Sequence, residues 1–344
     1  MRYKICIILG LLLLAVTSSA QRKGRGGAVR KQNVEEPAED PRITQMLNSI
    51  QQVVFIDSMV VDADDYMSHI PLSSYSGKLT QQTVLDGTFT NEMGDRKLVT
   101  IINSTDTTIA NSDFIGNRWT APLPIAGIGD DPAANPFLMP DGITLYYAQK
   151  GEKSIGGYDI FVTRYNSERG AFLKPENVGM PIASKANDIF YAVDEFNQLG
   201  YFVTDRRQPE GKVCIYVFIP TETRHTYHSE AYGIDQLRRL AAIGCIAETW
   251  PADKAGIQEA LARLENARAK GHLEQQARLG MEASELDTLR RQSEALDKAL
   301  TLTRNYYATA SNEERLKMRD EILRSEKQLE MLLIEIRNKE KQIP

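Results

Sequence analysis

The sequence contains little cysteine, histidine or tryptophan: three, four and two residues respectively among 344. No Cys-x-x-Cys pair occurs, which excludes the usual zinc and thioredoxin-type redox motifs. Gly-x-Ser-x-Gly, His-Glu-x-x-His and phosphate-loop patterns are also absent, so common signatures of hydrolases, metalloproteases and nucleotide-binding enzymes are missing. The sequence therefore predicts no catalytic residue, no cofactor and no metal ligand.

Long hydrophobic runs are lacking too. The longest, residues 5–16, is shorter than the ~20 residues that a membrane-spanning helix needs. Arg2 and Lys4 precede it and small residues follow it, a pattern typical of a Sec signal peptide (residues 1–20) cut after Ala20. Gln21 stands where a lipoprotein would carry cysteine. We expect export to the periplasm or to the periplasmic face of the outer membrane, with no transmembrane segment in the mature chain.

Basic residues are outnumbered, with 41 against 46 acidic ones and a net charge of −5. Without Arg2 and Lys4 the balance is 39 to 46, a net charge of −7. A nucleic-acid-binding face is normally basic, so the composition argues against nucleic acid as a partner. Cys214 and Cys245 could pair in an oxidising compartment. We favour two unpaired small residues, Cys214 in a strand and Cys245 in a helix.

Residues 21–42 carry a basic half and an acidic half, with glycines and prolines between them. Too few apolar side chains are present for a core, so we expect a disordered tether.

A repeated β-hairpin organises residues 43–232. Residues 143–148 and 158–166 alternate β-branched, aromatic and polar side chains around a turn, as the two strands of a hairpin do. Residues 201–205 and 215–218 repeat this pattern, and Asn135-Pro136-Phe137 is echoed by Asn187-Asp188-Ile189-Phe190. A repeat of about 45–55 residues has the spacing of a propeller blade.

These repeats predict a mainly β, propeller-like domain whose ring is either closed or incomplete. It would contain about four blade units, at 52–94, 95–142, 143–197 and 198–230. A β-sandwich, which also consists of short strands separated by turns, is the alternative.

Residues 135–207 carry a more specific motif. They contain Pro140-Asp141-Gly142, Gly156-Gly157-Tyr158-Asp159-Ile160 and Gly200-Tyr201-Phe202-Val203-Thr204-Asp205-Arg206. These residues resemble the WD40-like, TolB-type β-propeller repeat, in the version found in cell-envelope proteins of the Bacteroidetes. The resemblance implies the propeller fold and a place in the envelope, where some such proteins serve type IX secretion or gliding machinery.

Residues 233–344 are predicted to form an all-α region with a coiled-coil-like hairpin. Apolar residues recur at helical spacing in residues 235–248 and again from Ile257. Two long helices of about 40–45 Å should follow and form an antiparallel hairpin, closed near residues 308–311. Ser311 and Glu314 form a capping box at the second helix. The expected seams are Leu286, Leu289, Leu296, Leu300 and Tyr307 on the first helix, and Leu316, Ile322, Leu329, Leu333 and Ile336 on the second.

Six residues are candidates for contacting a partner: Trp119, Tyr158, Asp159, Tyr165, Asp205 and Arg206. Asp159 and Asp205 follow the repeat motif, where such aspartates tie turns by accepting backbone hydrogen bonds. Acid–base catalysis at a channel mouth is the alternative. Trp119 and Tyr165 could form a carbohydrate or peptide platform, although core packing explains most aromatic residues here.

Other polar residues suggest a metal site only weakly. Asp62, Asp64 and Asp65, and likewise Asp130 and Asp131, could hold calcium but lack the spacing of a calcium loop, so turn-forming roles are favoured. His225 and His228 would face opposite sides of a strand. His69 and His272 are isolated in the sequence, and we expect them to face solvent.

Taken together, the sequence favours an exported, non-catalytic envelope protein that acts as a protein-interaction scaffold, in the manner of an accessory of secretion or gliding machinery. Envelope proteins are the expected partners, and self-association through the C-terminal helices is left open. The alternatives are a propeller hydrolase or lyase acting on glycans or peptides, and a periplasmic ligand-sensing propeller.

Overall fold

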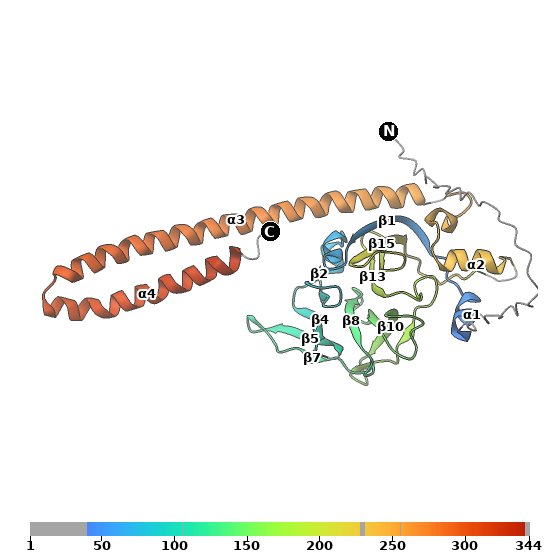
Figure 1. The fold of residues 1–344 in the computed structure, drawn as a ribbon, viewed down its shortest axis with the longest axis horizontal. Helices are drawn as coiled ribbons and strands as arrows, with labels where there is room; N and C mark the ends of the chain where they lie inside the picture. Colours follow the sequence, from blue (N-terminus) through green and yellow to red (C-terminus); the bar gives the residue numbers. More distant parts are fainter. Residues whose placement is uncertain (1–39, 105, 228–230, 255, 341–344) are drawn as a thin grey trace, which may run out of the picture. The chain divides into compact units, whose positions relative to one another are not determined.

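The computed structural model describes residues 40–104, 106–227, 231–254 and 256–340 (Figure 1). The predicted signal peptide and most of the predicted tether lie outside these residues. The last two residues assigned to the tether instead begin the first helix, α1 (Pro41–Leu47), and Asp40 is its N-cap. The Asp40 side chain caps α1 by accepting a hydrogen bond from the backbone N–H of Arg42 at 2.9 Å.

Fifteen strands form three antiparallel sheets in the described residues. The first sheet has the order β1 (Val54–Asp62), β15 (Lys212–Ile219), β14 (Leu199–Thr204) and β13 (Asp188–Asp194). The second contains β8 (Ala133–Leu138), β9 (Thr144–Gln149), β10 (Asp159–Asn166), β11 (Ala171–Phe172) and β12 (Glu176–Asn177). The third contains β2 (Lys78–Thr80), β3 (Thr88–Thr90), β4 (Arg96–Ile102), β5 (Thr107–Ile115), β6 (Arg118–Trp119) and β7 (Leu123–Pro124).

The prediction of a mainly β region followed by helices is confirmed, as are both predicted hairpins, which are β9–β10 and β14–β15. The unit count is different, because three sheets form rather than four. The predicted first unit, residues 52–94, is divided. Its first strand, β1, pairs with β15 from Val54 to Asp62 and covers that edge of the first sheet, while β2 and β3 join the third sheet.

Aromatic side chains fill the interior where the three sheets meet. Phe137 of β8 contacts Phe89 of β3, with ring centroids 5.2 Å apart, and Phe190 of β13, at 6.4 Å. Tyr66, in the 3₁₀ helix η1 (Tyr66–His69), packs on Phe190 at 5.9 Å. All four side chains are buried, so one core serves all three sheets.

Asn135 joins the sheets through hydrogen bonds. Its side chain is fully buried, accepts from the N–H of Gly87 at 2.9 Å, and donates to the carbonyls of Val84 and Ile189, each at 2.9 Å. Val84 and Gly87 precede β3, and Ile189 lies in β13, so one side chain of the second sheet contacts both other sheets. Asn187, its echo in the sequence, likewise reaches the second sheet by accepting from the N–H of Tyr158 at 3.2 Å.

Helices follow the last strand: α2 (Ile234–Ala241), the 3₁₀ helix η3 (Ile246–Thr249), α3 (Ile257–Thr309) and α4 (Asn312–Glu340). The second predicted helix and the first arm of the predicted hairpin are one continuous helix, α3. At 1.5 Å per residue its 53 residues extend about 80 Å, longer than predicted. Gly271 and Gly280 lower helix propensity but do not end α3, because no proline interrupts it.

The first turns of α3 belong to the β core. Ile257, Ala260 and Leu264 are each at most 1% exposed and pack against the sheets. One turn further on, the guanidinium of Arg268 lies 2.7 Å from the carboxylate of Asp57 in β1. The beginning of α3 is thereby fixed to the first sheet.

Beyond this region α3 and α4 form the predicted antiparallel hairpin (Figure 1). The turn falls at Ala310–Ser311, and Glu314 accepts from the backbone N–H of Ser311 at 2.9 Å, as the capping-box prediction required. The predicted α3 seam is confirmed, with Leu286 and Leu300 buried. On α4, Ile336 is buried, but Leu316 and Leu333 are exposed and do not belong to the seam. Three ion pairs, Arg290–Glu340, Arg304–Glu326 and Lys339–Glu285, link the helices.

Both cysteines in the described residues are unpaired. Cys214 lies buried in β15, as predicted, whereas Cys245 is exposed and precedes η3 rather than lying inside a helix. No helix in residues 40–340, apart from the few positions not described, is long and apolar enough to cross a bilayer.

Replacing Asn135 tests the junction of the three sheets. Asn135→Ala should lower the free energy of unfolding by roughly 3–5 kcal/mol. It leaves two buried backbone groups and one half-buried group without their hydrogen bonds, and it places a residue with a Cβ but no polar side chain at φ 53°. Urea unfolding followed by circular dichroism measures the loss. Asn135→Gly is the matched control, because it removes the same hydrogen bonds but adopts a positive φ without strain. It should therefore lose about 1 kcal/mol less than Asn135→Ala. Wild-type stability in both variants would contradict the role of Asn135.

Candidate functional site

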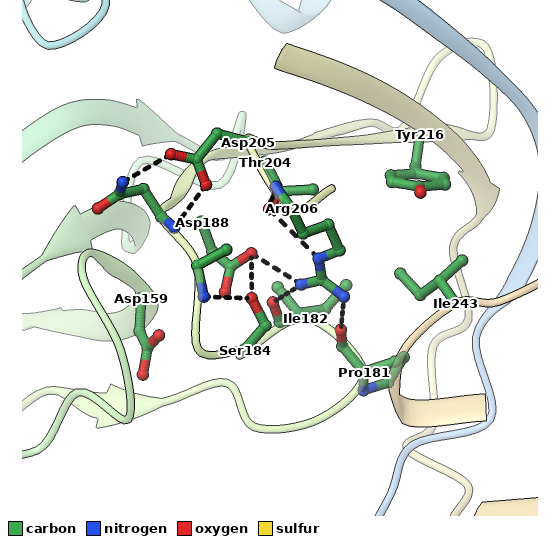
Figure 2. A network of polar contacts seen from close by, with 12 residues as sticks. Asp159, Pro181, Ile182, Ser184, Asp188, Thr204, Asp205, Arg206, Tyr216 and Ile243 are labelled. Atoms are coloured by element: carbon green, nitrogen blue, oxygen red, sulfur yellow. Dashed lines mark hydrogen bonds and ion pairs between the residues drawn. The ribbon is translucent and has the colours of Figure 1, made fainter. Parts of the chain in front are cut away.

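Residues from the repeat motif meet in a buried polar network (Figure 2). Arg206, 5% exposed, follows β14, and its guanidinium donates to the carboxylate of Asp188 at 2.7 Å. The same guanidinium donates to the carbonyls of Pro181 at 3.0 Å and Ile182 at 2.7 Å. Because arginine presents several donors in one plane, a single side chain fixes the 181–182 segment against two strands.

Asp159 and Asp205 make the turn-tying contacts that the motif predicts. Asp205 accepts from the backbone N–H of Asn187 at 2.8 Å and from its side-chain amide at 2.6 Å. Asp159 accepts from the backbone N–H of Ile155 at 2.8 Å and from the side chain of Asn177 at 2.7 Å. Both carboxylates therefore hold loops between strands.

Burial alters the acidity of this network. Burial raises the pKa of Asp159 to about 7, and the nearby charge of Asp188 adds to the rise. Burial also raises the pKa of Asp188, and the Arg206 guanidinium opposes that rise. Asp159 and Asp188 are fully buried, and each has one carboxylate oxygen without a hydrogen-bond partner among the described residues. In this fold Asp159 and Arg206 are interior residues and do not present a surface to a partner.

The aromatic candidates lie on separate elements. Trp119 is half-buried in β6, with the Lys97 ammonium 4.0 Å from its ring centroid. Tyr165, 41% exposed in β10, packs edge-on against Phe172. Tyr158 lines a cavity of about 540 Å³, and its hydroxyl lies 3.3 Å from that of Thr107. No contact joins Trp119, Tyr158 and Tyr165 in the described part of the chain, so they do not form one platform.

A larger groove, of about 770 Å³, lies between η1, β2 and residues 268–274 of α3. His69 and His272 are both exposed, as predicted, but both line this groove rather than standing apart. The remaining lining combines apolar side chains with a charged rim. The apolar residues are Met59, Met67, Ile70, Pro71, Leu72 and Leu79, and the charged ones are Asp65, Lys78, Arg268 and Glu274.

Sequence reasoning missed this groove because nothing local identifies it. It exists because α3 continues beyond the core and passes η1 and β2, which precede it in the chain by almost two hundred residues. The separate histidines were visible in the sequence, but their common location depends on the continuity of α3.

An exposed aromatic pair lies beside the groove. Tyr75 and Phe196 are 62% and 60% exposed, and their ring centroids are 4.8 Å apart. Tyr75 belongs to the 3₁₀ helix η2 (Ser74–Ser76), two residues before the groove residue Gly77. The Lys270 ammonium of α3 lies 5.9 Å from the Phe196 ring.

Asp194 holds the two loops that carry these rings. Its fully buried carboxylate accepts from the N–H of Ser73 at 2.8 Å and the hydroxyl of Ser76 at 2.7 Å, on either side of Tyr75. It also accepts from the backbone and side-chain amides of Asn197, next to Phe196. One buried carboxylate therefore anchors the backbone beside both exposed rings.

Metal-ligating residues do not cluster in the part of the chain that the structure describes: no group of three or more His, Cys, Asp or Glu is placed to hold an ion. Asp64 accepts from the N–H of Val84 at 3.1 Å, and Asp131 accepts from the side chain of Gln149 at 3.1 Å. Asp62 pairs with Lys212 at 2.7 Å. His225 contacts Thr223, and His228 lies outside the described residues.

Known protein-family models and curated protein sequences provide no match to this chain. The groove, the aromatic pair and the buried network are therefore interpreted from their own geometry.

Asp159→Asn tests the buried carboxyl. In the wild-type protein, ionisation of Asp159 costs more in the folded than in the unfolded state, because its folded pKa of about 7 exceeds the ordinary value of 3.8. The folded state thus binds more protons, and this contribution to stability is lost as pH rises towards 7. Between pH 5 and pH 8 the wild type should lose roughly 2–3 kcal/mol more than Asp159→Asn. Urea titrations at the two pH values measure this difference, and parallel pH slopes would contradict it.

Arg206→Met tests the ion pair. Removing the guanidinium leaves the Asp188 carboxylate buried without its cation, so we expect a loss of roughly 3–5 kcal/mol in the free energy of unfolding. Combining it with Asp188→Asn removes the buried charge and should recover part of that loss. Thermal and urea unfolding measure the stability of Arg206→Met and of the double variant. An equal loss of stability in the two would exclude an electrostatic cause.

Proposed function

We propose that this chain is an exported, non-catalytic scaffold of the cell envelope whose helical hairpin binds a partner protein. In this proposal the β region anchors the hairpin, and α3 and α4 provide the binding surface. This proposal rests mainly on one observation, the presence of a second apolar face on each helix of the hairpin.

On α4 the two faces are distinct. Leu316, Leu323 and Ile334 are 71%, 53% and 52% exposed. They are separated by seven and eleven residues, spacings that return to the same side of a helix with 3.6 residues per turn. This side lies opposite the seam that contains Ile336, because 334 and 336 differ by about half a turn. If α4 packed only against α3, one apolar face, the seam, would be enough.

Exposed apolar residues also lie on α3, and one of them, Tyr306, reaches α4 as well, since its hydroxyl lies 3.3 Å from the Glu314 carboxylate. Leu302 and Tyr306 are 70% and 55% exposed, and Met281 is 73% exposed. Met281 and Tyr306 are twenty-five residues apart, close to seven full turns, so they share a side. Exposed apolar residues arranged in stripes, unlike single scattered ones, indicate a protein-interaction surface. The regular helical geometry of both stripes fits helices of a partner protein, or of a second copy of this chain.

The attachment of α3 to the β region supports this role. Because the start of α3 is buried in the β core and Arg268 pairs with Asp57, the hairpin continues from a fixed helix rather than from a loop. A fixed helix presents its side chains to a partner with less loss of conformational entropy than a free one.

The envelope location rests on the signal-peptide pattern of residues 1–20 and on the resemblance of residues 135–207 to TolB-type repeats. Three antiparallel meanders that share one core, with the first and last strands paired, support a propeller-like interpretation of the β region. By analogy, we further propose an accessory role in secretion or gliding machinery.

An enzymatic function gains little from the geometry. A carboxyl with a pKa of about 7, such as Asp159, would suit acid–base catalysis. Asp159 is fully buried, however, and lines neither of the two cavities described above.

A double substitution tests the hairpin surface. Leu323→Glu with Ile334→Glu places charge on the outer side of α4 and leaves the seam intact, so the fold should persist while partner binding falls at least tenfold. The measurement is co-purification from envelope extracts of the source cells, with the partners quantified by mass spectrometry and self-association measured by sedimentation.

Gln328→Glu with Lys317→Gln is the matched control, because it makes the same change in net charge at exposed positions of α4 that lie away from the side carrying Leu316, Leu323 and Ile334. The control should retain the wild-type partner. An unchanged partner set in the Leu323/Ile334 variant, or a protein that sediments alone and turns over a glycan, would contradict the scaffold proposal.

A further inference from the structure

The edge strand β2 has backbone groups that no other strand uses. It is the terminal strand of the third sheet and pairs only with β3 in the described residues. Residues 77–81, which include β2, also line the 770 Å³ groove. The free edge of the sheet and the groove therefore occupy the same place.

The ladder shows which backbone groups face outward. Asn91 donates to the carbonyl of Arg96 at 3.0 Å, and Thr100 donates to that of Gly87 at 3.2 Å. Residues 87, 89 and 91 thus face β4, and because antiparallel pairs alternate, Thr88 and Thr90 face β2. Their partners are Thr80 and Lys78, which leaves the N–H and C=O of Leu79 directed away from β3.

The opposite wall of the groove is kept open by a glycine in α3. A Cβ placed on Gly271 would lie 3.8 Å from the Cβ of Pro71, so a longer side chain at this position would extend into the groove beside residues 70–72. Glycine inside a helix costs about 1 kcal/mol relative to alanine. A larger side chain here would be better for α3 but would fill the groove.

The charges of the groove favour an acidic ligand group. Asp65 lies 3.3 Å from the His69 ring, Arg268 pairs with Asp57, and Glu274 pairs with Lys270. Lys78 is exposed and has no ion-pair partner within the described ranges. Among the apolar residues of the lining, Met67 and Ile70 are buried, whereas Pro71, Leu72 and Leu79 are half-buried and offer a surface for one apolar group.

We propose that this groove binds an extended peptide segment of a partner protein, which adds to the third sheet as a further strand beside β2. One peptide residue exchanges both backbone hydrogen bonds with Leu79, in the manner of β-strand addition. An apolar side chain of the peptide packs against Pro71, Leu72 and Leu79, and a neighbouring acidic side chain pairs with Lys78. The exposed Tyr75–Phe196 pair, two residues before Gly77, extends the surface.

This site is separate from the outer faces of the hairpin and does not depend on the function proposed for them. The edge strand β2 is only three residues long and carries a lysine, and both properties disfavour non-specific pairing with other strands. Only a segment that also fits the groove gains enough contact to bind.

The test uses the purified full-length protein and a phage-displayed library of random 12-residue peptides. Enriched peptides are synthesised, and their affinities are measured by fluorescence anisotropy. Leu79→Pro removes the outward N–H but keeps the N–H groups of Lys78 and Thr80, and Gly271→Leu fills the groove. Each should weaken peptide binding at least tenfold. Hydrogen exchange at residues 77–81 of the wild type should slow when peptide is bound.

Two matched variants keep the test specific. Leu79→Val retains the N–H, and Gly280→Leu makes the same change on α3 where no atom lies within 4 Å, so both should bind within about twofold of the wild type. If Leu79→Pro unfolds at a much lower temperature than the wild type, the comparison of peptide binding by Gly271→Leu and Gly280→Leu carries the test, because both of these substitutions stabilise α3. The proposal is overturned if no peptide is enriched, or if Gly271→Leu binds as tightly as Gly280→Leu. It is also overturned if a folded Leu79→Pro binds like Leu79→Val.

Discussion

Asn135 is the constraint on which the β region depends. The three antiparallel sheets share one core, and this side chain joins them. Phe137, two residues later, inserts its ring between Phe89 and Phe190 at the same point. Hydrogen bonds in a dry interior are directional, whereas aromatic packing is less so. Asn135 therefore sets the arrangement of the sheets, and the rings supply most of the buried area.

Local patterns carried much of the fold. The alternation in residues 143–166 predicted β9 and β10, and the stripe from Leu286 to Tyr307 predicted the seam of α3, because both depend on near neighbours. The number of sheets could not be predicted in this way. Val54–Asp62 pairs with Lys212–Ile219 across most of the β region, and such a pairing leaves no local signal.

The site was less predictable than the fold, for a physical reason. The motif residues Asp159 and Arg206 are specified strongly because a buried charge needs defined partners, so they mark the interior and not the surface. Tyr75, Phe196 and Leu79 belong to no motif. Tyr75 is placed by Asp194, more than one hundred residues away in sequence, and Leu79 lines a groove that exists only because α3 passes it. The sequence pattern placed Leu316 and Leu333 in the seam with Ile336, and excluding them required knowing which side of α4 faces α3.

The continuity of α3 has a mechanical consequence. No loop or proline separates Ile257, buried among the strands, from Thr309 at the hairpin turn. A force applied at the far turn is therefore carried along one backbone to Leu264 and the Arg268–Asp57 pair without a joint that could absorb it. A protein that pulls on the hairpin would therefore pull on residues 268–274 of α3, which form one wall of the groove beside β2. Force at the far turn would in this way change the width of the groove.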